Sequence, residues 1–224
     1  EIDEASSCIK AGKIESTFMS HADSLSNSIW LDKWLNELGV DYPANSINTS
    51  SLKSSVFSKP SRDLNSIKIP ELKKEISPIV FGCDNQINEV HAFAMFDYYY
   101  SKGGKVFDTA YIYNHGLSDK YLGDWINSRN LTDVVVLGKG AHTPDCFPDK
   151  IKPQIEESLS RGNIDKLDIY CLHRDNLDVP VTEFIDALND CKKEGLIDVL
   201  GASNWELERF KSANDYAHEQ QKAG

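Results

Sequence analysis

From about residue 68 onward, the sequence alternates between short apolar runs and segments whose apolar residues recur at helical spacing. Five such units follow one another at intervals of roughly 25–35 residues. Because parallel strands need long crossover connections, this alternation predicts a parallel sheet covered by helices. The apolar runs that we expect to be strands are 79–83, 106–108, 134–138, 167–172 and 197–204.

Two architectures fit this alternation, an open doubly wound sheet and a closed barrel. No predicted strand is followed by the GxGxxG turn that is typical of a dinucleotide-binding Rossmann unit. A barrel therefore fits better, although the sequence contains only about five of the eight units of a complete one. We expect an α/β fold, an incomplete (β/α)8 TIM barrel, in residues 68–224.

The residues before the barrel fall into two segments of different character. Residues 1–43 predict short helices, the longer one spanning about 24–38. Residues 44–67 are rich in Ser and Asn and contain few side chains that could fill a core, which is typical of a linker. We therefore expect a short helical segment, a linker and then the barrel.

The composition limits the partners and the compartment. The formal net charge of −11 argues against nucleic acid and anionic membranes as partners. No apolar run approaches the roughly 20 residues of a membrane-spanning helix. The five cysteines are odd in number and form no CxxC pair, which favours free thiols in a reducing compartment. We expect a cytoplasmic location.

Four chemically active residues stand at or just past the ends of three predicted strands. Lys139 ends an apolar run and needs a partner, and Asp108 stands at the same end of the preceding strand. A structural ion pair would explain those two residues alone. Tyr113 favours catalysis, because an ammonium beside a phenol lowers the phenol pKa and makes it a usable proton donor. With His173 on the next strand, the set suits protonation of a carbonyl oxygen while hydride reaches the carbonyl carbon.

The segments around these residues resemble the signatures of the aldo-keto reductases in order and spacing. The matching segments are Phe107-Asp108-Thr109-Ala110-Tyr111-Ile112-Tyr113, Gly116-Leu117-Ser118-Asp119, Gly138-Lys139-Gly140, Asp168-Ile169-Tyr170-Cys171-Leu172-His173 and Gly201-Ala202-Ser203-Asn204. The resemblance implies a (β/α)8 barrel that uses NADP or NAD without a Rossmann motif. It implies that Tyr113 is the general acid, that Lys139 and Asp108 tune it, and that His173 orients the substrate.

The same resemblance implies which residues contact the cofactor. Ser203 and Asn204 would bind the nicotinamide carboxamide, and further contacts would come from Gly82, Cys83 and Asp108. The sequence departs from many relatives after the catalytic tyrosine, where Asn114-His115 replaces a glycine. We expect this departure to affect the lip of the pocket, and hence the range of substrates, more than the chemistry.

A second resemblance concerns the N-terminal segment. Residues 4–16, 19–21, 31–32 and 39–43 resemble the C-terminal tail of the glucose–fructose oxidoreductase and inositol dehydrogenase family. It implies an upstream Rossmann-type oxidoreductase domain in cis, and thus a fusion of which this chain is a fragment. A sugar or polyol then becomes a reasonable guess for the small-molecule carbonyl or alcohol substrate. The alternative is an unrelated helical extension.

Two other functions fit parts of the pattern. His142 and His173, with Asp108 and Asp175, could belong to a metal-dependent barrel hydrolase, but Lys139 would take the cation's place and no HxH pair exists. A non-catalytic barrel that senses or binds the cofactor would also keep these residues. Because five parallel strands leave two open edges, we expect residues 1–224 alone to associate through an edge and to be inactive.

Overall fold

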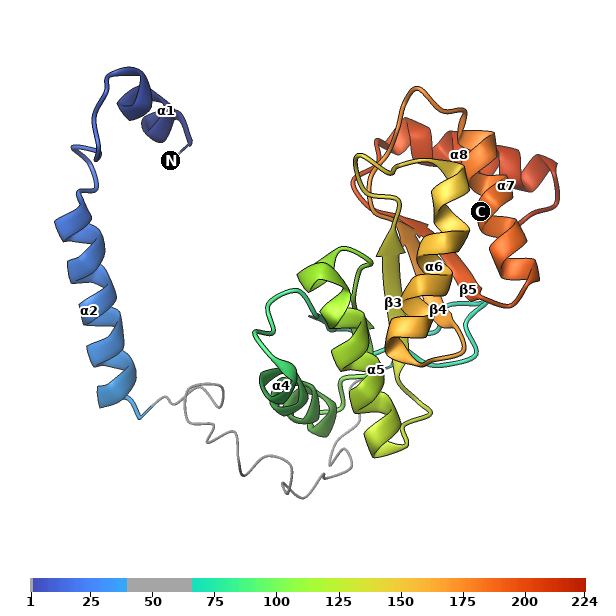
Figure 1. The fold of residues 1–224 in the computed structure, drawn as a ribbon, viewed down its shortest axis with the longest axis horizontal. Coiled ribbons are helices and arrows are strands. Elements are labelled where there is room, and N and C mark those ends of the chain that lie inside the picture. Colours follow the sequence, from blue (N-terminus) through green and yellow to red (C-terminus); the bar gives the residue numbers. More distant parts are fainter. Residues whose placement is uncertain (1, 40–65) are drawn as a thin grey trace. The chain divides into compact units, whose positions relative to one another are not determined.

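The computed structural model describes residues 2–39 and 66–224, and its contacts divide the chain into two compact units, Glu1–Ile47 and Asn48–Gly224. The first unit contains α1 (Ile2–Lys10) and α2 (His21–Glu37) (Figure 1). The predicted second helix is thus confirmed with an earlier start. It begins there because Ser20 and Asp23 form a reciprocal capping box. The linker predicted at 44–67 lies outside the described residues, except for its last two.

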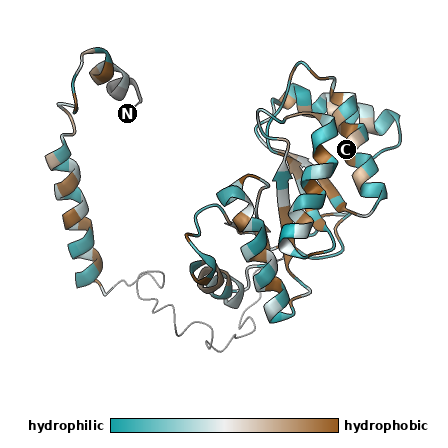
Figure 2. Cartoon of the chain, in the orientation of Figure 1, coloured by the Kyte–Doolittle hydropathy of each residue, from teal (hydrophilic) through white to brown (hydrophobic). Residues whose placement is uncertain are grey.

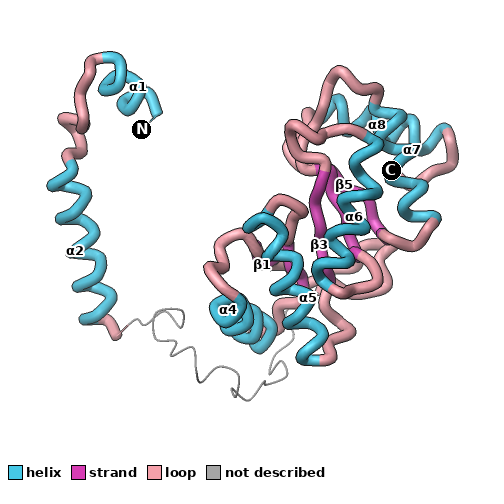
Figure 3. Tube along the Cα trace, viewed as in Figure 1, coloured by secondary structure: helices cyan, strands magenta, loops and turns pink. Residues whose placement is uncertain are grey.

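The second unit contains five strands that form one parallel sheet in the order β1-β2-β3-β4-β5. This topology confirms the predicted α/β class and the partial (β/α) barrel with five units. Figure 3 shows the strands in magenta, with helices beside them. The strands are β1 (Val80–Gly82), β2 (Val106–Asp108), β3 (Val135–Gly140), β4 (Leu167–Leu172) and β5 (Ile197–Ala202).

A helix follows each strand. The first four of these helices pack on the sheet through apolar side chains, and the last one buries Ala213 and Ala217 against Ile185 of the fourth. The layer between sheet and helices is centred on fully buried aromatic rings such as Phe107, Trp125 and Phe184. Figure 2 shows hydrophilic residues over much of α6 and α7, as expected for helices with one covered face. The helices are α4 (Glu89–Ser101), α5 (Leu117–Arg129), α6 (Pro148–Gly162), α7 (Val181–Lys193) and α8 (Leu207–Glu219).

The opposite face of the sheet carries a second, smaller core. Because successive side chains of a strand alternate between faces, Val106, Val135 and Ile169 turn away from the helices and pack together with Leu72. Lys74, from the segment before β1, donates hydrogen bonds to the Val134 carbonyl oxygen at 2.6 Å and to the Asp168 carboxylate at 2.9 Å. Residues 66–77 therefore cover the end of the sheet where the strands begin.

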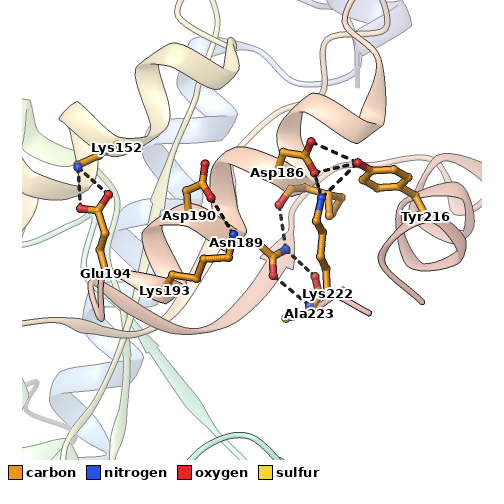
Figure 4. Close-up of polar contacts among 10 residues, drawn as sticks. Lys152, Asp186, Asn189, Asp190, Lys193, Glu194, Tyr216, Lys222 and Ala223 are labelled. Atoms are coloured by element: carbon orange, nitrogen blue, oxygen red, sulfur yellow. Dashed lines mark hydrogen bonds and ion pairs between the residues drawn. The ribbon is translucent and has the colours of Figure 1, made fainter. Parts of the chain in front are cut away.

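The last helices are joined by polar contacts (Figure 4). The Tyr216 hydroxyl donates a hydrogen bond to the Asp186 carboxylate at 3.0 Å, and Lys222 pairs with the same carboxylate at 2.5 Å. Asn189 exchanges two hydrogen bonds with the backbone of Ala223, at 2.9 and 3.0 Å. These contacts fix α8 and the residues after it against α7.

The third strand extends further than predicted, and α5 begins at Leu117, after Gly116 in a left-handed conformation. Lys139 was expected to follow its strand, but it is the next-to-last residue of β3, because pairing with β4 continues through Gly140. Across the described ranges 2–39 and 66–224, no helix is long and apolar enough to cross a membrane.

Candidate active site

The four predicted site residues lie together at the carboxyl ends of the strands. Asp108 is the last residue of β2, and His173 directly follows β4. Tyr113 opens η2 (Tyr113–Gly116), the short helix between β2 and α5. Parallel strands bring their carboxyl ends to the same edge, which is where barrels and open α/β sheets place their sites.

Lys139 and Asp108 form an ion pair between their side-chain Nζ and Oδ1 atoms. The side chain of Lys139 is 7% exposed and that of Asp108 is 33% exposed. Burial lowers the pKa of Lys139 to about 8. With this pKa Lys139 is still mostly an ammonium at neutral pH, and the contacting carboxylate of Asp108 favours that form.

Glycines on both sides of Lys139 allow this strand to pass close to its neighbours. A Cβ atom at Gly138 would lie 2.6 Å from the Leu167 side chain, and one at Gly140 would lie 2.2 Å from the Tyr170 hydroxyl oxygen. Packing therefore explains the two glycines of the Gly138-Lys139-Gly140 segment, and the expected chemistry explains the lysine. Larger residues there would displace the lysine.

Tyr113 lies beside both Lys139 and His173. The Lys139 Nζ atom is 4.9 Å from the centroid of the Tyr113 ring, and the Tyr113 and His173 rings meet edge to face at 5.7 Å. Burial, aided by the Asp84 carboxylate, raises the pKa of Tyr113. The predicted lowering of this pKa is therefore wrong. Lys139 lies over the ring face and is paired with Asp108.

His173 is a buried and neutral imidazole. Burial, together with the charge of Lys139 and the proximity of His142, lowers the pKa of His173 to about 4. Its Nδ1 atom is buried without a hydrogen-bond partner among the described residues. A neutral imidazole at this place can hydrogen-bond a substrate oxygen without adding a second positive charge next to Lys139.

His142, which was expected only as a candidate metal ligand, is a neighbour of the site. Its ring lies 4.8 Å from that of His173, and its Nδ1 atom lies 2.9 Å from the Thr143 carbonyl oxygen. The sequence could have indicated this position, because His142 follows the end of β3 by two residues. The described residues contain no group of three His, Cys, Asp or Glu side chains arranged to hold a metal ion. Asp175, which the metal-site hypothesis also included, forms an ion pair with Arg209 at 3.2 Å.

The residues expected to contact a cofactor lie at the same edge. The amide nitrogen of Asn204 donates a hydrogen bond to the Ser203 hydroxyl oxygen at 2.9 Å and approaches the His173 carbonyl oxygen at 3.4 Å. Gly82 is exposed at the end of β1. Cys83 is fully buried, and its backbone N–H donates to the Asp108 carbonyl oxygen at 2.8 Å. Because the residue is fully buried and its N–H is already paired, the structure does not support the predicted contact between Cys83 and a cofactor.

A match to a protein-family model identifies the family of this chain. The sequence model described as the Aldo/keto reductase family matches residues 79–223, which include all four residues of the site. The chain belongs to the aldo/keto reductase family. The matched region also contains all five strands of the sheet.

Individual aldo/keto reductase relatives agree with this assignment. The chain is 29% identical over 175 residues to norsolorinic acid reductase B of Dothistroma septosporum, covering 67% of this chain and 44% of that protein. It is 27% identical over 146 residues to a probable aryl-alcohol dehydrogenase of Saccharomyces cerevisiae, covering 58% and 44%. The chain thus spans less than half the length of these two curated relatives.

A solved structure of the aldo/keto reductase family shares the fold. The holo form of an aldo-keto reductase from Bacillus halodurans superimposes with a TM-score of 0.61 at 26% identity, over 68% of this chain and 54% of that one. A glycerol dehydrogenase from Gluconobacter oxydans reaches the same TM-score at 20% identity, over 68% and 52%, which supports the fold alone.

Proposed function

We propose that the protein containing this chain is an NAD(P)H-dependent aldo-keto reductase that interconverts a carbonyl and an alcohol. The observation that carries the proposal is the placement of a protonated phenol, Tyr113, against the Lys139–Asp108 ion pair and a neutral His173. A raised phenol pKa keeps the Tyr113 proton in place until a substrate oxygen is there to accept it.

Each residue has a separate part in the proton transfer. Tyr113 donates its hydroxyl proton to the carbonyl oxygen, and Lys139 stabilises the phenolate that this leaves. Asp108 keeps Lys139 in its ammonium form. His173 hydrogen-bonds the same oxygen and orients the carbonyl. A bound nicotinamide cofactor would supply the hydride to the carbonyl carbon.

The residues at the edge of the sheet fit such a cofactor. Within the described part of the chain, the hydrogen bonds of Asn204 use its amide nitrogen, so its amide oxygen can accept from a carboxamide N–H group. The Ser203 hydroxyl can donate to the carboxamide oxygen. Gly82 and Asp108 complete the proposed contacts, whereas Cys83 is fully buried. These proposed contacts are compatible with NADP and with NAD.

The proposed substrate class is a small carbonyl compound or alcohol. The relatives named above are a norsolorinic acid reductase and a probable aryl-alcohol dehydrogenase, which makes an aromatic carbonyl one candidate. The resemblance of the N-terminal segment to the tail of a family of sugar and polyol oxidoreductases makes a sugar or polyol the other candidate. An upstream oxidoreductase domain in cis is proposed on the same resemblance.

The test is a reductase assay on the full-length protein. NADPH and NADH oxidation would be followed with a panel of aryl aldehydes and aldoses, for the parent protein and for Tyr113→Phe. We expect the variant to lose about 10²–10⁴-fold in turnover, the usual contribution of a general acid, and to retain cofactor binding. Turnover by Tyr113→Phe at the parent rate would remove Tyr113 from the mechanism. Cofactor binding by the parent without turnover of any carbonyl would favour a cofactor-sensing barrel.

A further inference from the structure

The loop that carries Tyr113 has an unusual backbone. Asn114, His115 and Gly116 all have positive φ angles, of 49°, 54° and 87°. Non-glycine residues rarely adopt this conformation, and successive ones persist only where surrounding contacts enforce them. Asn114 supplies one such contact, because its side-chain amide donates to the Gln86 carbonyl oxygen at 3.2 Å.

The backbone N–H of Tyr111 donates a hydrogen bond to the Lys139 carbonyl oxygen at 2.7 Å, and further contacts come from Arg161, in the last turn of α6. Its Nη1 atom donates a hydrogen bond to the Tyr111 carbonyl oxygen at 2.8 Å. Its guanidinium carbon lies 4.4 Å from the centroid of the Tyr111 ring. Nη2 of the same guanidinium pairs with Glu157 at 2.5 Å, and the Tyr111 hydroxyl donates to Glu157 at 2.8 Å. Arg161 therefore holds Tyr111, two residues before Tyr113, by its backbone and its ring.

The same guanidinium supports the far end of the loop. A Cβ atom at Gly116 would lie 2.5 Å from the guanidinium carbon of Arg161. The guanidinium thus fills the space that a side chain at Gly116 would need. Arg161 therefore contacts the chain on both sides of Tyr113, at Tyr111 and at Gly116.

A buried carboxylate ties this support to the end of β2. Asp119 is 5% exposed, and the Thr109 hydroxyl donates a hydrogen bond to it at 2.7 Å. The Nη1 atom of Arg161 lies 3.6 Å from the other Asp119 oxygen. Thr109 directly follows Asp108 at the start of the loop. The Asp119–Arg161 pair therefore links this start to α6, the helix whose Arg161 also supports the end of the loop. Neither Asp119 nor Arg161 has a part in the proton transfer.

We propose that Arg161 is a positioning residue for Tyr113: it holds the strained loop 109–116 so that the phenol stays against Lys139 and His173. This inference rests on the proposed function for its kinetic consequence. Its structural consequence, an immobile loop, does not depend on that function. A guanidinium is suited to the task because it is planar, always charged, and can donate in several directions while stacking on a ring.

The test compares Arg161→Ala with Arg129→Ala. Arg129 is a matched control, since it lies in the last turn of α5, pairs with Asp97 at 2.9 Å and lies 5.1 Å from the centroid of the Phe93 ring, away from the loop. We expect similar losses of thermal stability in both variants. Only Arg161→Ala should lose about 10–100-fold in kcat, the usual effect of a misplaced catalytic group, with little change in the KM for cofactor.

Two further measurements separate positioning from general damage. Added guanidinium ion should restore part of the kcat of Arg161→Ala and none of that of Tyr113→Phe, and Arg161→Lys should retain an intermediate kcat. Hydrogen exchange should become faster in residues 109–116 of Arg161→Ala and stay unchanged there in Arg129→Ala. Equal kcat values for the two alanine variants, or unchanged exchange in 109–116, would overturn the proposal. If the parent protein lacks reductase activity, the proposed function fails and the exchange experiment alone decides on the positioning.

Discussion

Lys139 and Asp108 form an ion pair at the carboxyl edge of the sheet, although they are not opposite one another in the strand register. Asp108 pairs in the register with Leu137, and Lys139 lies two residues further along β3. A step of two residues returns the side chain to the same face of the sheet. The pair therefore stands on the face that a barrel encloses, with Tyr113 above it.

The first prediction concerns the pH dependence of reduction. The Lys139 pKa of about 8 means that the ammonium form is lost as the pH rises through that value. In the proposed mechanism this ammonium stabilises the Tyr113 phenolate, so kcat/KM for reduction should fall above about pH 8. Lys139→Met should lower kcat/KM at neutral pH by about 10²–10³-fold and remove this alkaline limb.

Lys105→Met is a suitable control for this experiment. Lys105 also forms an ion pair, with Asp133 at 3.3 Å, but it lies at the opposite end of the sheet from the site. Its pH–rate profile should match that of the parent protein. An alkaline limb at the same pH in Lys139→Met would contradict the assignment of that limb to Lys139.

The second prediction concerns stability at low pH. His173 has a folded-state pKa of about 4, whereas an unfolded chain titrates near 6.5. Between these values the unfolded state binds more protons, so the free energy of unfolding falls as the pH falls. For one buried histidine the loss between pH 7 and pH 5 is about 1–2 kcal/mol.

Urea denaturation at pH 7 and pH 5 would measure this loss. His173→Gln lacks the titrating group, so its unfolding free energy should fall by less between the two pH values. His91→Gln, which replaces a histidine on α4, should keep the full dependence of the parent protein. If His173→Gln keeps it as well, another group is responsible for the acid destabilisation.

The sheet could be predicted from the sequence because its signal is local and repeated. Apolar runs such as Val134–Leu137 and the helical segments between them have different periods, and parallel order follows from their alternation. The grouping of Asp108, Tyr113, Lys139 and His173 could be predicted for the same reason, because parallel strands align their carboxyl ends.

What the sequence did not predict depends on side-chain positions in space. The Tyr113 pKa was expected to fall, since Lys139 stands nearby in the pattern. The pKa rises instead, because the phenol is buried and the Asp84 carboxylate lies near it. Arg161 was missed because it is far from Tyr113 in the sequence, on a helix whose periodicity gives no sign that its last turn reaches the loop after β2.

The third prediction concerns the proposed carboxamide contact. Asn204 has a φ angle of 60°, so glycine can replace it without backbone strain while removing its amide. Asn204→Gly should weaken NADPH or NADH binding by about 3–10-fold, the worth of one neutral hydrogen bond. Asn163→Gly is the matched control, because Asn163 has a φ angle of 47° at the end of α6. Fluorescence titration that gives the same affinity for both variants would remove Asn204 from the cofactor site.

The last prediction concerns the crossing of α5 and α6, the helices that bear Asp119 and Arg161. Gly123 of α5 approaches the backbone of Gly162 so closely that an added Cβ atom would lie 1.9 Å from the Gly162 carbonyl oxygen. Backbone cannot move aside as a flexible side chain can, so Gly123→Ala must push the two helices apart. Such overpacking costs about 1–3 kcal/mol or more.

Gly162→Ala provides the comparison, because its Cβ atom would lie 3.2 Å from its nearest neighbour, the Asp119 carbonyl oxygen. That contact is tight, but a shift of a few tenths of an ångström relieves it. We therefore expect a clearly larger loss of unfolding free energy for Gly123→Ala than for Gly162→Ala, measured by urea denaturation. Because separation of α5 and α6 also separates Asp119 from Arg161, hydrogen exchange in residues 109–116 should become faster in Gly123→Ala. Equal stability of the two variants would mean that the helices do not cross at Gly123.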